Sequence, residues 1–154
     1  MRNIEDKIDD QPMEIQRHFG QAIGDVSRAW RYEMNLLLKP FGLNLSQRQV
    51  LVQLHRHPDG LMQTDLARKL GIESPTLARL LDLLEKKEWI RRITSPDDHR
   101  RKYSTLTPKA MDQIFIIEKI SRQLLDRMMV GIAVDEVEAG FSVMEKIRRN
   151  LLEE

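Results

Sequence analysis

The sequence predicts a mainly α-helical chain of the α+β class, with one small β-hairpin set within a series of helices. Apolar residues recur at spacings of three and four through most of the 154 residues, which is the helical period. Proline and glycine interrupt this pattern at intervals, and the chain changes to an extended pattern between residues 89 and 106. Hydrophobic residues make up 41% of the chain, which is enough for a packed core.

The first expected element is one long amphipathic helix from Met13 to Lys39. Pro40 and Gly42 end it, because proline lacks a backbone donor and glycine readily leaves the helical conformation. A second, shorter helix follows, with Ser46 as its expected N-cap. The turn-forming residues 57–60 end this second helix.

Two further helices flank a tight turn that contains Gly71. The first runs from about Gln63 to Leu70. The second runs to about Lys87, with Ser74 as a candidate cap and Pro75 at the first helical position. Four leucines share one face of the second helix: Leu77, Leu80, Leu81 and Leu84. This pattern is typical of a helix-turn-helix, whose second helix enters the major groove of DNA.

Two extended stretches, Trp89 to Thr94 and Lys102 to Leu106, are separated by a turn-forming segment and predict the hairpin. Between residues 86 and 102 the chain has seven basic and three acidic residues, although its net charge is only +1 and both of its ends are acidic. This segregation favours a central surface for a polyanion, with a solvated charged loop as the alternative. We interpret the hairpin as a wing that reaches the DNA backbone or minor groove.

The last two helices are expected from Thr107 to about Val130 and from about Val134 to Leu152, with Gly131 between them. They carry more apolar side chains than one small domain can bury, so part of that surface should meet a partner. A homodimer would engage the two half-sites of a pseudo-palindromic operator, whereas an intramolecular helix bundle is the alternative. The predicted organisation is a helical dimerisation domain, residues 1–45 and 107–154, around a winged helix-turn-helix domain, residues 46–106.

Candidate DNA-contacting residues lie opposite the leucines of the second helix-turn-helix helix. Arg79 is the expected base reader, because a guanidinium can donate two hydrogen bonds to guanine; an ion pair with Asp82 is the alternative. Ser74 and Thr76 suit phosphate or base contacts, although capping would equally explain Ser74. The expected set on this helix is Ser74, Pro75, Thr76, Arg79 and Lys86.

The hairpin adds a second group of candidates. Arg100 is expected to insert into the minor groove, braced by a neighbouring carboxylate, Asp98 or Asp97. Arg101 and Lys102 are expected to contact phosphates. Two more arginines alternate along the first strand, so that only one can face DNA and either can be solvated: Arg91 and Arg92.

The segment from Asp98 to Thr107 resembles the wing signature of the MarR family, in which D-x-R is followed by five residues and then Leu-Thr. The segment from Gln63 to Ile90 is similar to the SlyA branch of that family. The resemblance implies a transcriptional regulator that reads the major groove with Pro75, Thr76 and Arg79, and the minor groove with Arg100.

Two positions depart from the family pattern. Glu88 stands where glycine is common, at the approach to the first strand. His99 takes the place of the usual arginine and is only partly charged near neutral pH, which should lower phosphate affinity.

The resemblance also implies a small aromatic carboxylate as a possible effector, because family members often bind such molecules between the dimer helices and the DNA-binding lobe. Arg17, His18 and Trp30 could hold an anion and stack a ring. Surface solvation or core packing is the simpler explanation for each of the three.

Other classes of function find little support. The sequence contains no G-x-S-x-G, no H-E-x-x-H and no phosphate-binding glycine pattern, so we expect no enzyme and no cofactor. The absence of cysteine excludes disulfides and thiolate metal sites. His55 and His57 should face different directions, and residues 97–99 lie at a hairpin tip, so neither group predicts a metal site. A winged-helix module that docks protein is the alternative, but it would not generally need the basic strip.

No apolar run approaches the roughly 18 residues of a membrane span, and the charged N-terminus differs from a signal peptide. We therefore expect a cytoplasmic protein without a membrane partner. The predicted function is a sequence-specific regulator of transcription that binds double-stranded DNA as a homodimer.

Overall fold

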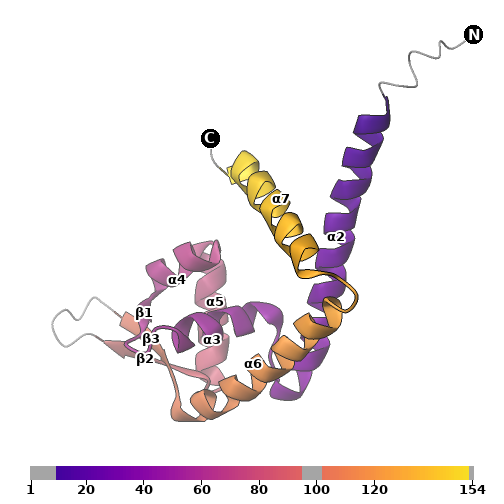
Figure 1. Ribbon diagram of the computed structural model, residues 1–154. Coiled ribbons are helices and arrows are strands. Elements are labelled where there is room, and N and C mark those ends of the chain that lie inside the picture. Colours follow the sequence, from indigo (N-terminus) through magenta and orange to yellow (C-terminus); the bar gives the residue numbers. More distant parts are fainter. Residues whose placement is uncertain (1–9, 95–101, 153–154) are drawn as a thin grey trace, which may run out of the picture. The chain divides into compact units, whose positions relative to one another are not determined.

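The computed structural model describes residues 10–94 and 102–152. Most of this part of the chain is helical, with one small antiparallel sheet, which confirms the predicted mainly helical α+β class (Figure 1). The chain forms two compact units, residues 1–121 and 122–154. The predicted division by function, at residues 45/46 and 106/107, stays a prediction.

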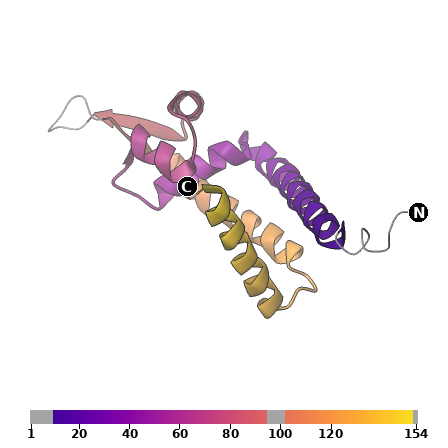
Figure 2. The same ribbon diagram turned by 90° about the horizontal axis from the view of Figure 1, so that it is seen from above.

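Helix α2 spans Asp10–Leu38 and appears as one continuous rod in Figure 2. The short 3-10 helix η1, Lys39–Phe41, follows it, and Gly42 ends the segment with a φ of 65°. Met34 and Leu38 are buried near the C-terminal end of α2, which packs on the next helix. By contrast, every side chain from residue 12 to residue 22 is exposed.

Three helices follow at close to the predicted bounds: α3 at Leu45–His55, α4 at Gln63–Leu70 and α5 at Ser74–Lys86. The predicted N-cap of α3, Ser46, is wrong, because Asn44 caps this helix. The Asn44 side chain accepts a hydrogen bond from Gln47 N at 2.9 Å, and the Gln47 side chain accepts one from Asn44 N at 3.1 Å. This reciprocal capping box satisfies two backbone donors at the start of α3.

The sheet has the order β1-β3-β2 and is antiparallel throughout. Strands β2, Ile90–Thr94, and β3, Lys102–Leu106, form the predicted hairpin, in which Ile90 pairs with Leu106 and Thr94 with Lys102. Strand β1, Leu61–Met62, was not predicted and pairs with the other edge of β3. Gly60 precedes it with a φ of 90°, and a Cβ there would lie 2.8 Å from Thr105 Cγ2, so this turn requires glycine.

The core lies where α3, α4 and α5 meet the sheet and the first part of α6, Pro108–Met128. These elements gather around the strands in Figure 1. Helix α3 crosses the core, and an ion pair of 2.9 Å joins Arg48 Nη2 on α3 to Glu118 Oε1 on α6. The largest fully buried core side chains include Leu51, Leu54, Leu66, Leu77, Leu81, Leu84, Ile90, Ile114 and Ile117.

The second unit holds the end of α6 and helix α7, Val134–Leu152, with Gly131 at a φ of 79° between them. The bounds of α7 agree with the prediction. No residue of α7 is buried, although apolar side chains recur along it at helical spacing. Among the described residues, no helix has the length and apolarity that crossing a bilayer would require.

Glu88 stands at a backbone position that favours glycine. Its N–H donates to Glu85 O and the N–H of Trp89 donates to Leu84 O, both at 2.9 Å, which is the Schellman arrangement at the end of α5. In this arrangement the residue after the cap adopts a left-handed conformation, and Glu88 has a φ of 62°. The departure from the family's glycine therefore leaves the turn intact but places a Cβ where it is strained.

We predict that Glu88→Gly raises the free energy of unfolding by about 0.5–1 kcal/mol, because glycine adopts this conformation without a steric cost. Glu88→Ala is the matched control, since it removes the charge and the 3.9 Å ion pair with Lys109 but keeps the Cβ. Urea denaturation measures all three proteins. Equal stabilisation by alanine and glycine would show that the charge, not the backbone, is responsible.

Candidate DNA-binding surface

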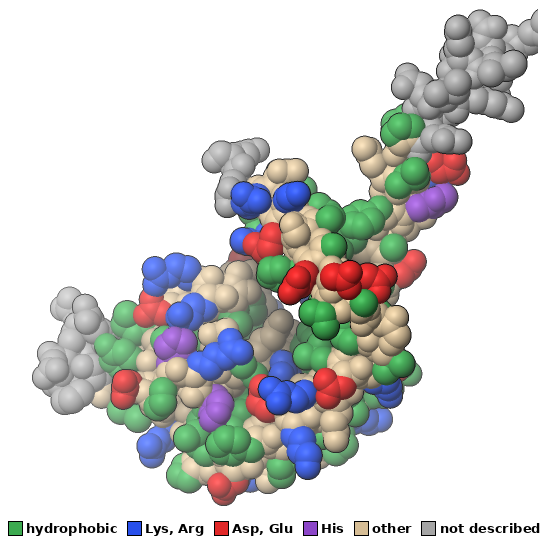
Figure 3. Space-filling view, viewed as in Figure 1, with side chains coloured by type: hydrophobic (Ala, Val, Ile, Leu, Met, Phe, Trp, Pro, Cys, Tyr) green, Lys and Arg blue, Asp and Glu red, His purple; other side chains and the backbone are tan. Residues whose placement is uncertain are grey.

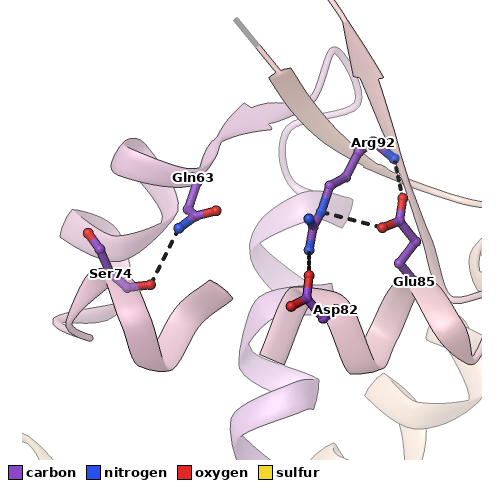
Figure 4. Close-up of polar contacts among 5 residues, drawn as sticks. All are labelled: Gln63, Ser74, Asp82, Glu85 and Arg92. Carbon is purple, nitrogen blue, oxygen red and sulfur yellow. Dashed lines mark hydrogen bonds and ion pairs between the residues drawn. The ribbon is translucent and has the colours of Figure 1, made fainter. Parts of the chain in front are cut away.

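The turn between α4 and α5 fixes the direction of α5. Gly71 ends α4 with a φ of 62°, and the N–H of Ile72 donates to Ala67 O at 3.1 Å. Across the turn, Gln63 Nε2 donates to Ser74 O at 3.3 Å, as Figure 4 shows. The first bond ends α4, and the second joins the start of α4 to the start of α5, so the two helices are linked as in a helix-turn-helix.

Helix α5 has one buried and one exposed face. Leu77, Leu81 and Leu84 are buried in the core. All five of the predicted contact residues on this helix are exposed: Ser74, Pro75, Thr76, Arg79 and Lys86. The leucine pattern therefore fixes which side of α5 faces outward, and the candidate readers share that side.

Helix α5 starts one residue earlier than predicted, so the expected positions of both Ser74 and Pro75 are wrong. Glu73, not Ser74, is the N-cap, and no side chain caps the helix; Ser74 is the first helical residue and Pro75 the second. The predicted capping role of Ser74 is therefore wrong. The uncapped N–H groups at this end, together with the helix dipole, favour an anion such as a phosphate.

Arg92 of β2 binds to two acidic side chains of α5 (Figure 4). Its Nη2 lies 2.5 Å from Asp82 Oδ1 and its Nε lies 3.6 Å from Glu85 Oε2. The backbone N–H of Arg92 also donates to Glu85 Oε1 at 3.2 Å. These contacts, which we call the Arg92 clamp, tie the first strand of the wing to the helix that carries Arg79.

The clamp bears on the alternative for Arg79, which was an ion pair with Asp82. Asp82 is engaged by Arg92 instead, and the Arg79 side chain has no hydrogen bond or ion pair with any of the described residues. Arg79 is exposed, one turn before Asp82 on α5. A free guanidinium at this place is available to a base edge or a phosphate.

The wing is described only along its two strands. Lys102 is exposed at the start of β3, opposite Thr94. Arg91 faces the other side of the sheet from Arg92, and its Nε lies 3.4 Å from Thr105 Oγ1. Three of the predicted wing residues lie outside the described residues: Asp98, Arg100 and Arg101.

The three candidate effector residues do not form one site within this chain. Arg17 and His18 are exposed near the start of α2, with Arg17 3.8 Å from Glu14. Trp30 is half-buried, and it lies about 18–20 Å further along the helix at 1.5 Å per residue. A single small carboxylate cannot reach both groups from one chain, so the effector stays a prediction. In the described ranges, no three acidic or histidine side chains come together as a metal site would need.

The Arg92 clamp was not foreseen from the sequence. Arg91 and Arg92 looked equivalent there, because strand alternation alone does not say which face packs on α5. A signal was present in Asp82 and Glu85, which are three residues apart and therefore neighbours on one side of a helix.

The comparisons with known proteins agree with this geometry. The MarR family model matches residues 41–101. The crystal structure of transcriptional regulator PA3341 is 39% identical over 88% of this chain and 99% of that chain, with a TM-score of 0.77. The protein thus has the fold of a winged-helix regulator. The chain belongs to the MarR family of transcriptional regulators, which confirms the predicted family.

Two other structures share the fold at lower identity. The MepR–DNA complex of S. aureus is 24% identical, covers 86% of this chain and 97% of that chain, and has a TM-score of 0.80. The transcriptional regulator SlyA is 22% identical, with coverages of 86% and 93% and a TM-score of 0.78.

We predict that Arg92→Ala lowers the free energy of unfolding by about 1 kcal/mol, because two partly exposed ion pairs and the side-chain hydrogen bond to Asp82 are lost, while the backbone bond to Glu85 remains. Arg91→Ala, one residue earlier on the opposite face of the strand, should change stability much less. Chemical denaturation compares the two variants. Equal losses would mean that the clamp contributes nothing beyond a generic arginine on this strand.

Proposed function

We propose that this protein is a sequence-specific regulator of transcription that binds double-stranded DNA as a homodimer. The observation that carries the proposal is Arg79, which lies exposed at the centre of the outward face of α5 and pairs with none of the residues that the structure describes. Arginine bonded to O6 and N7 of guanine is the commonest specific contact in the major groove. The helix-turn-helix geometry presents this side chain on the helix that such proteins place in the groove.

Neighbouring groups support DNA as the partner. The uncapped start of α5 and the exposed Lys102 suit phosphates on either side of the groove. A more distant structure with the same fold, S. aureus MepR, is a complex with DNA. On the basis of the sequence pattern, we also propose that two wing residues contact DNA. Arg100 would lie in the minor groove and Arg101 would contact a phosphate.

The homodimer rests on apolar surface that one chain leaves uncovered. On α2, Ile15, Phe19 and Val26 share one face and are 68%, 41% and 60% exposed. On α7, Val137, Phe141, Met144 and Leu151 recur at spacings of three, four and seven, and all are exposed. Figure 3 shows hydrophobic side chains at the surface of the projecting part of α2. A second copy of the chain would cover such faces and place two α5 helices about one DNA turn apart.

Binding measurements separate base reading from phosphate attraction. On a duplex selected from random DNA, Arg79→Ala should weaken binding by about 1–3 kcal/mol for each lost bidentate contact, with a much smaller loss on random duplex. Lys102→Ala should weaken binding to both duplexes about equally and reduce the salt dependence by about one counterion, because a phosphate contact carries no sequence information.

Binding isotherms over a range of salt concentrations give the loss of affinity and the salt dependence of each variant. Circular dichroism confirms that each variant is folded. Equal losses for Arg79→Ala on selected and random duplex would contradict the role of Arg79. Failure to select any sequence would contradict the proposed function and favour a module that docks protein.

We predict that Phe141→Glu converts the dimer to a monomer, because a charge would be buried in the apolar face between two copies. Ser142→Glu introduces the same charge one residue later, toward the polar side of α7, and should leave the dimer intact. Sedimentation equilibrium at micromolar concentration measures both. A wild-type monomer that binds the selected duplex specifically would contradict the homodimer.

A further inference from the structure

Leu83 is an apolar side chain on the outward side of α5, away from the core. It is 47% exposed, whereas the core leucines two positions before it and one after it, Leu81 and Leu84, are buried. At 100° per residue, Leu83 lies about 130° from the midpoint between these two leucines. Single exposed leucines are common on protein surfaces, so the position of Leu83, rather than its exposure alone, is informative.

That position is one turn after Arg79. Residues four apart on a helix are neighbours on one face, about 6 Å apart along the axis. Thr76 precedes Leu83 by seven residues and also lies close to this face. Arg79 is thus flanked along the helix by the Thr76 methyl group on one side and by the Leu83 side chain on the other.

The Arg92 clamp makes this surface more suitable for DNA. The nearest acidic side chain, Asp82, is adjacent to Leu83 but is paired with Arg92. Its charge is therefore partly compensated, and it repels the phosphates less than a free carboxylate would. The uncharged surface around Leu83 can then approach the floor of the groove.

Only one apolar group is exposed at base edges in the major groove, and it is the 5-methyl group of thymine. We propose that Leu83 is a specificity residue that recognises a thymine methyl group in each half-site. This inference rests on the proposed function, because it requires α5 to lie in the major groove. Since 6 Å spans about two base-pair steps of 3.4 Å, the thymine lies within about two base pairs of the guanine that Arg79 reads.

The test replaces each thymine of the selected duplex in turn by deoxyuridine, which removes only the 5-methyl group and keeps the hydrogen bonding of the base pair. For the wild-type protein, replacement of this thymine in one half-site should weaken binding about fourfold, from the burial of one methyl group. Replacement in both half-sites of a dimer should weaken it roughly fifteenfold. Leu83→Ala should bind the thymine and deoxyuridine duplexes equally at that position.

Lys86→Ala is the matched control on the same helix. It should weaken binding overall but keep the fourfold preference for thymine, because a lysine contact does not depend on a methyl group. Leu83 is exposed, so its replacement by alanine should leave the thermal unfolding midpoint nearly unchanged.

Three outcomes would overturn the inference while the proposed function stands. They are a deoxyuridine penalty that Leu83→Ala retains, the absence of any thymine whose methyl group matters, and a selected site without thymine within about two base pairs of that guanine. If the protein selects no DNA sequence, the proposed function itself has failed.

Discussion

The Arg92 clamp is the interaction on which the candidate surface depends. Without it, Asp82 and Glu85 would leave two uncompensated carboxylates beside the side chains that should approach a polyanion. With it, one arginine offsets part of their charge and ties β2 to α5, so the wing and the helix-turn-helix form a single surface. The Arg92 side chain is 27% exposed, but Asp82 and Glu85 are 66% and 43% exposed, so solvent screens both pairs and together they contribute about 1 kcal/mol.

The clamp works because the rest of the lobe fixes its partners. Leu77, Leu81 and Leu84 anchor α5 in the core, and the left-handed turn at Glu88 leads the chain from α5 directly into β2. The pairing of Ile90 with Leu106 then sets which face of the strand meets the helix. The same burial that stabilises the fold therefore determines that Arg79 and Leu83 point outward. In this way the packing of the core decides which side chains of α5 can contact bases.

Much of this fold could be predicted from the sequence, because helical periods and turn residues are local signals. The bounds of α7 and the cap at Gly71 agree with the predictions. Strand β1 has only two residues, too few to show a period, so it could not be predicted. The cap of α3 is Asn44 and not Ser46, because Asn44 makes reciprocal hydrogen bonds with Gln47. The clamp joins residues ten apart through tertiary packing, so local patterns could not identify it. The exposure of Arg79 was predictable, but the partner of Asp82 was not.

The central claim is that Arg92 keeps Asp82 away from Arg79 and so leaves Arg79 free to read bases. The most direct test is the ratio of affinities for selected and random duplex in Arg92→Ala and in the double variant Arg92→Ala/Asp82→Ala. The single change should release Asp82 to pair with Arg79 and lower the ratio roughly fivefold over two half-sites, from about 0.5 kcal/mol per helix pair. The double variant should recover the wild-type ratio. A ratio that stays as low in the double variant would contradict the account.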